Sequence, residues 1–236
     1  DIWWTTGGNW NRATSAANWS KRDSFGVLYY DGKVWVLGGY NGSVYINDVW
    51  YSTNMIDWTR ATEHAAWSGR SQAGYYVYDN KMWVYGGLNG SNNLNDVWYS
   101  TNGINWTHVV AHASWVDRYG LAYTVYDNKM WVMDGYGSNL NDVWYSTNGA
   151  NWTQATAGAN WSVRRLFDSV TYDNKIWVMG GLYGGAPGDL HDVWSSQDGI
   201  NWYNWGNVSW SKRHGFEAIV FKDKMWLLGG QNYSQP

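Results

Sequence analysis

Two carboxylates are the residues of this sequence best placed to do chemistry together. Asp168 and Glu217 occupy the same position in two successive copies of a repeated segment, where the other copies carry Gly or Ala. Paired carboxylates can run acid–base or glycosidic chemistry, or hold a cation. The alternative is two hydrated acids in a water-filled channel, paired with Arg165 or His214, and we favour this second interpretation.

A tryptophan followed three residues later by an arginine recurs along the chain. The five pairs are Trp19–Arg22, Trp67–Arg70, Trp115–Arg118, Trp161–Arg164 and Trp210–Arg213. In one interpretation the indoles wedge between neighbouring sheets and the arginines satisfy backbone carbonyls. In the other, the rings surround one face of the molecule and stack on sugars or cations, with the guanidinium groups donating hydrogen bonds.

Positions next to this motif differ from copy to copy while the framework around them stays fixed. The residue after the arginine is Asp23, Ser71, Tyr119, Arg165 or His214. The residue that follows the glycines at the end of the second marker is Tyr40, Leu88, Tyr136, Leu182 or Gln231. Such divergence indicates specialised contacts, although neutral drift at exposed positions explains it equally well. The predicted ligand-binding residues are Trp19, Arg22, Asp23, Tyr40, Trp67, Arg70, Trp115, Arg118, Tyr119, Tyr136, Trp161, Arg164, Arg165, Asp168, Trp210, Arg213, His214 and Glu217.

The elements that must position these residues come from one internal repeat. The tryptophans of the motif are spaced by 48, 48, 46 and 49 residues, and a second marker, Lys33-Val34-Trp35-Val36-Leu37-Gly38-Gly39, recurs with the same spacings. Each repeat predicts four short strands, which in the first copy are Phe25–Tyr30, Lys33–Leu37, Asp48–Ser52 and Trp58–Ala61. Four short strands per repeat are typical of one blade of a β-propeller.

The two ends of the chain complement one another. A third marker, Asp48-Val49-Trp50, is missing after Trp226 and is found instead at Asp1-Ile2-Trp3. Closing a ring removes exposed sheet edges. We therefore predict one all-β domain over residues 1–236, a five-bladed propeller with four antiparallel strands per blade, whose amino-terminal strands complete the last blade. The predicted blades span approximately 14–61, 62–109, 110–155, 156–204, and 205–236 plus 1–13.

These motifs resemble the kelch superfamily of propellers, in its bacterial-type variety W-S-x-R … W-V-x-G-G … D-V-W-Y-S … G-x-N-W. The resemblance covers essentially the whole chain and implies the propeller fold. It leaves the function open, because kelch-type propellers serve as enzymes, adaptors and lectin-like binders. Kelch rings commonly hold six or seven blades, so a longer parent array cut to this length is the alternative to five.

Composition excludes several classes of function. The net charge is −3, and the 16 lysines and arginines are dispersed, which disfavours nucleic acid and anionic membranes as partners. No apolar run is long enough for a membrane helix. The absence of cysteine excludes disulfides and the Cys–Tyr copper chemistry of galactose-oxidase-like propellers, and His108 and His112 are at most a weak metal pair. We expect no enzyme activity, no cofactor and no metal.

We expect a lectin-like, carbohydrate-binding propeller that uses its Trp- and Arg-rich loop face. The alternative is a protein- or peptide-binding kelch module on the same face, and a third possibility is an engineered repeat scaffold without ligand. Five similar sites would suit sugars, whereas one asymmetric groove would suit a peptide. The start at Asp1 without Met predicts a processed, excised or engineered segment, expected as a monomer, and an extracellular or secreted location is favoured.

Overall fold

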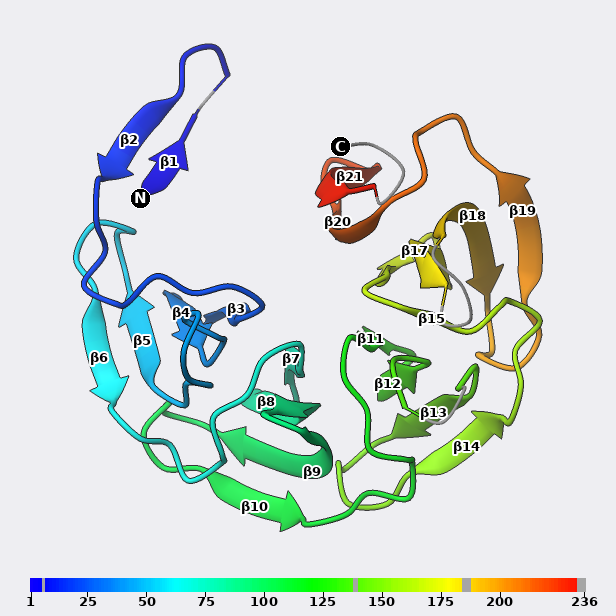
Figure 1. Cartoon of the computed structure of the whole chain (residues 1–236), viewed down its shortest axis with the longest axis horizontal. Coiled ribbons are helices and arrows are strands. Elements are labelled where there is room, and N and C mark those ends of the chain that lie inside the picture. Colours follow the sequence, from blue (N-terminus) through cyan, green and yellow to red (C-terminus); the bar gives the residue numbers. More distant parts are fainter. Residues whose placement is uncertain (6, 138–139, 184–187, 233–236) are drawn as a thin grey trace.

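The chain folds into strands and turns arranged around a central axis (Figure 1). This computed structural model describes residues 1–5, 7–137, 140–183 and 188–232, and no helix occurs among them. The strands form antiparallel sheets of four that radiate from the middle, which confirms the predicted all-β, propeller-type architecture.

Four blades are complete, and each contains its four strands in chain order. The first consists of β3 (Gly26–Tyr30), β4 (Lys33–Leu37), β5 (Val49–Ser52) and β6 (Thr59–Thr62). The second consists of β7 (Gly74–Tyr78), β8 (Lys81–Asn89), β9 (Asn92–Ser100) and β10 (Thr107–Val110). The third consists of β11 (Ala122–Tyr126), β12 (Lys129–Met133), β13 (Val143–Ser146) and β14 (Thr153–Thr156). The fourth consists of β16 (Asp168–Tyr172), β17 (Lys175–Tyr183), β18 (Asp189–Ser196) and β19 (Tyr203–Asn207), with the short β15 (Arg164–Arg165) paired to β17.

Local sequence explains these strands. In β3 the side of Leu28 and Tyr30 is buried while Val27 and Tyr29 are exposed, which is the period of two expected for a half-buried strand. The hairpin between β7 and β8 turns through Asp79 and Asn80, whose φ angles are 49° and 52°. Asp and Asn tolerate this left-handed conformation, so the repeated Tyr-Asp-Asn-Lys segments form tight turns.

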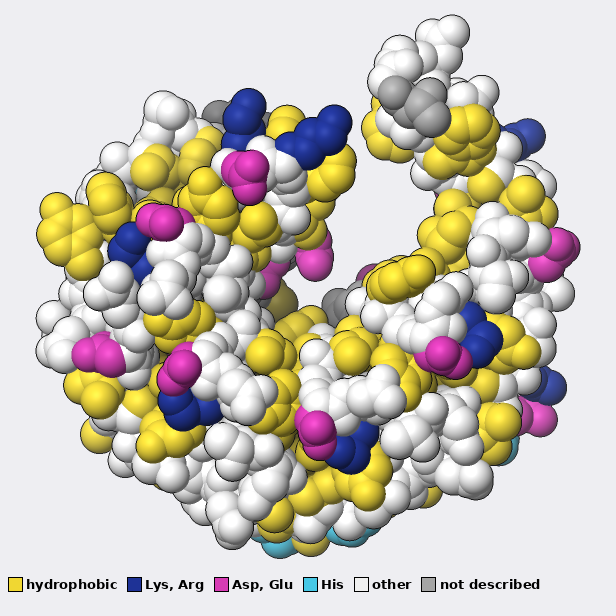
Figure 2. All heavy atoms as spheres, turned by 180° about the vertical axis from the view of Figure 1, so that it is seen from behind, with side chains coloured by type: hydrophobic (Ala, Val, Ile, Leu, Met, Phe, Trp, Pro, Cys, Tyr) yellow, Lys and Arg dark blue, Asp and Glu magenta, His cyan; other side chains and the backbone are white. Residues whose placement is uncertain are grey.

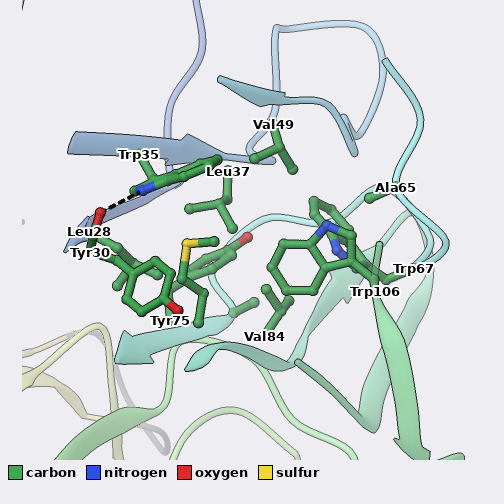
Figure 3. Close-up of a cluster of buried hydrophobic side chains, with 12 residues drawn as sticks. Leu28, Tyr30, Trp35, Leu37, Val49, Ala65, Trp67, Tyr75, Val84 and Trp106 are labelled. Carbon is green, nitrogen blue, oxygen red and sulfur yellow. Dashed lines mark hydrogen bonds between the residues drawn. The ribbon is translucent and has the colours of Figure 1, made fainter. Parts of the chain in front are cut away.

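The core lies between neighbouring blades rather than within one blade. Figure 3 shows Trp35 and Leu37 of the first blade facing Tyr75 and Val84 of the second. The Trp35 Nε1 donates to the carbonyl of Tyr30 at 3.0 Å, so its polar edge is satisfied while its ring packs. The same arrangement repeats around the molecule, with Trp83, Trp131 and Trp177 in place of Trp35.

The two ends of the chain form half-blades, and the predicted closure of the ring is not found. β1 (Ile2–Trp4) pairs only with β2 (Asn11–Thr14), and β20 (His214–Val220) only with β21 (Met225–Gln231). Residues 1–13 therefore do not complete the sheet of β20 and β21, and a gap separates the two half-blades (Figure 1). The rotation from one blade to the next is fixed by the packing between blades. Its sum around the axis does not bring the sheet of β20 and β21 next to that of β1 and β2.

Candidate functional site

The repeated tryptophans and arginines are structural in the complete blades. Arg70 donates through Nη1 and Nη2 to the two carboxylate oxygens of Asp96, at 2.7 and 2.8 Å, and through Nη1 to the carbonyl of Gly86 at 2.9 Å. Equivalent pairs join Arg22 to Asp48, Arg118 to Asp142 and Arg164 to Asp192. The side chains of all four arginines are inaccessible to solvent.

These ion pairs set the charge state of their carboxylates. Burial alone would raise the pKa of Asp96, but the hydrogen bonds and charge of Arg70 outweigh it and lower that pKa. The pKa of Asp192 is lowered in the same way beside Arg164. A bidentate Arg–carboxylate pair of this kind holds the loop before each blade onto the third strand of that blade.

The tryptophans of the motif pack inside the molecule. Trp67 meets the ring of Trp106 edge-on, with centroids 5.7 Å apart, and the half-buried Trp19 meets Trp58 in the same way at 5.8 Å. The predicted ring of exposed, ligand-stacking indoles is therefore wrong for Trp67, Trp115 and Trp161, whose rings are buried. The predicted binding residues that the structure buries are Trp67, Trp115, Trp161, Arg22, Arg70, Arg118 and Arg164.

The two divergent series of positions come together in the structure. Backbone bridges pair the residue after each arginine with the residue after the glycine pair, once per blade. The pairs are Asp23 with Tyr40, Ser71 with Leu88, Tyr119 with Tyr136, Arg165 with Leu182 and His214 with Gln231. Each blade thus presents a different pair of side chains from one and the same backbone position.

Next to these pairs, a chain of backbone hydrogen bonds runs from blade to blade around the axis. Gln72 N donates to Ser24 O, Gly120 N to Gln72 O, Leu166 N to Gly120 O and Gly215 N to Leu166 O, at 2.8 to 3.0 Å. All five residues have positive φ angles between 51° and 61°. Every blade therefore contributes one fixed residue to the mouth of the central channel.

A cavity of about 480 Å³ lies below this mouth. Its lining includes the aromatic residues Tyr75, Tyr123 and Phe216 and the acidic residues Asp23, Asp168 and Glu217. The molecule is hollowed at its middle, and acidic side chains lie at the edge of the hollow (Figure 2). The cavity thus combines an aromatic wall with an acidic one.

The aromatic wall of the cavity was not predicted from the sequence. A Cβ on Gly26 would lie 2.4 Å from the ring of Tyr75, and a Cβ on Gly74 would lie 2.1 Å from the ring of Tyr85. These two glycines leave room for tyrosine rings that fill the inner edge of the first blades. The signal was present, since glycine replaces a side chain at this strand position only in the first two copies.

The acidic wall of the cavity contains Asp168 and Glu217, the two carboxylates at equivalent repeat positions. Asp168 on β16 and Glu217 on β20 occupy equivalent register positions in adjacent sheets, opposite Met179 and Leu228. Asp168 Oδ2 accepts from Ala218 N at 2.6 Å, which links β16 to β20. Burial, followed by the charge of Glu217, raises the pKa of Asp168 to about 7. Burial also raises the pKa of Glu217.

The expected partners of these acids are engaged elsewhere. Arg165 donates to Tyr119 Oη at 3.2 Å and lies over the ring of Tyr136, 4.5 Å from its centroid. His214 is buried, with Nδ1 2.5 Å from Asp189 Oδ1, so it is not an exposed rim residue as predicted. Among the described residues, no lysine or arginine forms an ion pair with Asp168 or Glu217.

Of the remaining predicted residues, Asp23 lines the cavity, Tyr40, Tyr119 and Tyr136 are not among its lining residues, and Trp210 and Arg213 lie in the last half-blade. Tyr136 is exposed and half-buried Tyr119 packs against it, with ring centroids 5.0 Å apart. Tyr40 packs against Tyr45 at 4.9 Å, beside exposed Asp23. Trp210 and Arg213 belong to the β20–β21 half-blade, and their surroundings differ from those of their counterparts.

The histidine pair does not converge on a common point. His108 stacks on Trp98 with ring centroids 4.1 Å apart, and His112 Nδ1 lies 3.1 Å from Asn95 Oδ1. The described part of the chain contains no group of three or more potential metal ligands. It also contains no helix of the length and apolarity that a membrane crossing requires.

Comparison with known proteins identifies one motif. Residues 21–51, which span β3, β4 and the start of β5, match the kelch motif. No curated protein matches the chain. Kelch repeats generally form non-catalytic binding scaffolds, and the motif suggests a propeller that serves as a protein-interaction module. Residues 21–51 carry the kelch motif, and the repeats around them build a kelch-type β-propeller fold that is open on one side.

Proposed function

We propose that this chain binds a segment of another protein at its central cavity, with a lysine or arginine of that partner seated against Asp168 and Glu217. The observation that carries the proposal is the pair of carboxylates on one wall of the cavity of about 480 Å³. The coarse function, protein interaction, is the one that the kelch motif suggests.

The acidic wall offers free acceptor capacity. The two Asp168 oxygens accept from Ala218 N and Ser169 N, and each keeps a further lone pair. Glu217 is exposed, and its carboxylate makes no hydrogen bond to another described residue. A guanidinium or ammonium group placed here would gain charge-assisted hydrogen bonds to both side chains.

The aromatic part of the lining suits the rest of such a side chain. Tyr75, Tyr123 and Phe216 line the cavity, so the methylene stem of a lysine or arginine would lie along aromatic rings. Burial, together with the charges of Asp168 and Glu217, raises the pKa of Tyr123 well above its usual value, so its phenol stays neutral. The cavity therefore provides both acidic groups and apolar contact.

The asymmetry of the site supports a peptide over a sugar. The two adjacent acids lie on β16 and β20, a third, Asp23, lies in the segment before β3, and the Tyr119–Arg165–Tyr136 cluster belongs to the third and fourth blades. The five equivalent indole sites that motivated carbohydrate binding lose their support, because Trp67, Trp115 and Trp161 are buried and only Trp19 and Trp210 are partly exposed. One groove with different chemistry around its rim suits a single peptide segment.

A phage-displayed library of random dodecapeptides tests this proposal, with a glycan array run in parallel. We expect enriched peptides to carry lysine or arginine, and the Asp168→Asn/Glu217→Gln double variant to bind them at least about 10-fold more weakly. Since Asp168 must be ionised to hold a cation, the affinity should rise between pH 6 and pH 8. The matched control Asp57→Asn/Glu63→Gln changes exposed acids elsewhere and should leave binding unchanged.

Three results would overturn the proposal. One is the absence of any enriched peptide, another is undiminished binding by the Asp168→Asn/Glu217→Gln variant, and the third is glycan binding that this variant abolishes while no peptide binds.

A further inference from the structure

The two half-blades lack the contacts that hold every complete blade together. We call β1 and β2, with Asp1, the head half-blade, and β20 and β21, with the preceding Trp210–Arg213 segment, the tail half-blade. The head holds the third and fourth strands of a blade, and the tail holds the first and second. Three separate features show that each half-blade has what the other is missing.

The first feature is charge. Asp1 Oδ2 accepts from Trp3 Nε1 at 2.9 Å, as Asp96 Oδ2 accepts from Trp98 Nε1 at 2.7 Å. Asp96 is also bound by Arg70, whereas among the described residues no arginine reaches Asp1. The head half-blade therefore carries the acceptor of the repeated ion pair without its donor.

The tail half-blade carries the donor. Arg213 donates to the carbonyl of Ser211 at 3.1 Å and to that of Gly229 at 2.7 Å, which reproduces the backbone contacts of Arg70. Within the described ranges it meets no carboxylate, and no described strand occupies the third-strand position next to β21. Asp1 stands at the repeat position that would supply that carboxylate.

The second feature is the pair of indoles. Trp10 of the head half-blade is 66 % exposed, whereas its counterpart Trp106 is 8 % exposed. Trp106 is covered by the edge of Trp67, and Trp210 of the tail half-blade is the residue equivalent to Trp67. The head thus exposes a ring whose packing partner lies on the tail.

The third feature is an open strand edge. In the third blade Trp131 pairs with Tyr145 and Met133 with Val143, across β12 and β13. The corresponding edge of β21 has no neighbour among the described strands, and its Leu228 is 50 % exposed where Met133 is fully buried. The same register would set Leu228 opposite Ile2 of β1. Unpaired edges of this kind template the addition of a strand.

We propose that the head half-blade of one copy docks on the tail half-blade of a second copy, so that the two copies share one complete blade. The occupant is a second copy because the missing charge, indole and strand are all supplied by this chain. Within one chain the two half-blades form separate sheets on either side of the gap (Figure 1). The contact is head-to-tail, a heterologous interface in the sense of subunit symmetry, and it replaces the expectation of a monomer.

A charge-swap mixing experiment tests this assembly. Asp1→Arg and Arg213→Asp each place like charges at the shared blade, so each variant alone should lose association at least about 10-fold. In an equimolar mixture, the aspartate introduced at position 213 of one chain meets the arginine introduced at position 1 of the other, and association should return. The measurement is mass by light scattering or sedimentation over a range of concentrations, against a single-copy mass of 27.1 kDa.

Each result of this experiment either supports the proposal or overturns it. Wild-type mass that rises above 27.1 kDa with concentration, together with recovery in the mixture, supports the proposal. Wild-type chain that stays at the single-copy mass overturns it, as closure of the ring within one copy would, and so does a mixture that fails to recover. Arg60→Asp, at an exposed arginine on the outer strand of the first blade, is the control and should associate as the wild type does. Recovery in the mixture also shows that both variants are folded.

Discussion

The complete blades and the half-blades contain the same motif in two different environments. Arg118 is buried against Asp142, whereas Arg213 makes the same backbone contacts without a carboxylate. Trp106 is buried and Trp10 is exposed. The difference shows that the sequence motif alone does not bury its Trp and Arg side chains. Burial requires the full complement of four strands and a neighbouring sheet, so the same residue type contributes unequally along the chain.

The largest expected contrast concerns the fourth-strand tryptophans. Trp106→Ala should lower the free energy of unfolding by about 3–5 kcal/mol, since it empties a packed site against Trp67. Trp10→Ala should lower it by less than about 1 kcal/mol, because its ring is exposed. Urea unfolding of dilute protein, before copies associate, measures both. Equal losses in the two variants would contradict the contrast.

The second contrast concerns the arginines. Arg118→Ala leaves the buried Asp142 without its cation and should cost about 3 kcal/mol of unfolding free energy. Arg213→Ala removes backbone contacts only and should cost about 0.5–1 kcal/mol. The same denaturant titration serves here. A loss for Arg213→Ala as large as that for Arg118→Ala would indicate that Arg213 already has a carboxylate partner in dilute solution.

A third, smaller contrast concerns glycines in the outer hairpin turns. A Cβ on Gly103 would lie 2.1 Å from the ring of Trp35 in the preceding blade, and its φ is +72°. Gly8 in the head half-blade has a φ of +101° and no atom within 4 Å of such a Cβ. Gly103→Ala should therefore cost about 2–3 kcal/mol and Gly8→Ala about 1 kcal/mol, the second from backbone strain alone. Thermal unfolding midpoints compare the two variants. A smaller drop in the midpoint for Gly103→Ala than for Gly8→Ala would show that the Trp35 ring moves aside at little cost.

The internal repeat of the sequence predicted the positions of the strands well. The expected strand Phe25–Tyr30 is β3, Gly26–Tyr30, and the expected Lys33–Leu37 is β4. These segments are short and strongly patterned, and their turns contain residues that tolerate positive φ, so local physics decides them. The equivalence of Asp168 and Glu217 followed from the same period and is confirmed by their register.

What the sequence could not predict depends on contacts between blades. Closure of the ring requires the sum of all interblade steps, and each step is set by packing such as that of Trp35 against Gly103. Whether Trp67 faces solvent or the interior depends on which side the next sheet covers. The repetition of Trp67 and Arg70 in every copy favoured packing, and the structure agrees with that alternative.

The last contrast concerns the acid that links the tail half-blade to the fourth blade. Asp168 accepts a hydrogen bond from Ala218 N on β20, and its pKa lies near 7 instead of its ordinary 3.8. Because the folded state binds this proton more tightly than the unfolded chain, Asp168 contributes most stability below about pH 4. That contribution falls as the pH rises towards 7 and is constant above it.

Asp168→Asn should therefore remove part of the decline in unfolding free energy between pH 4 and pH 7, by about 1–2 kcal/mol once solvent screening of this half-buried group is allowed for. Asn keeps one oxygen that can accept from Ala218 N, so the link between β16 and β20 is retained. Its NH2 group replaces the oxygen that accepts from Ser169 N, and the cost of that lost bond is the same at every pH. Asp173→Asn, in the exposed turn of the same blade, is the matched control and should preserve the decline. Urea midpoints at pH 4, 6 and 8 distinguish the two variants. If Asp168→Asn declined as steeply as the wild type, a group other than Asp168 would bind the proton responsible for the decline.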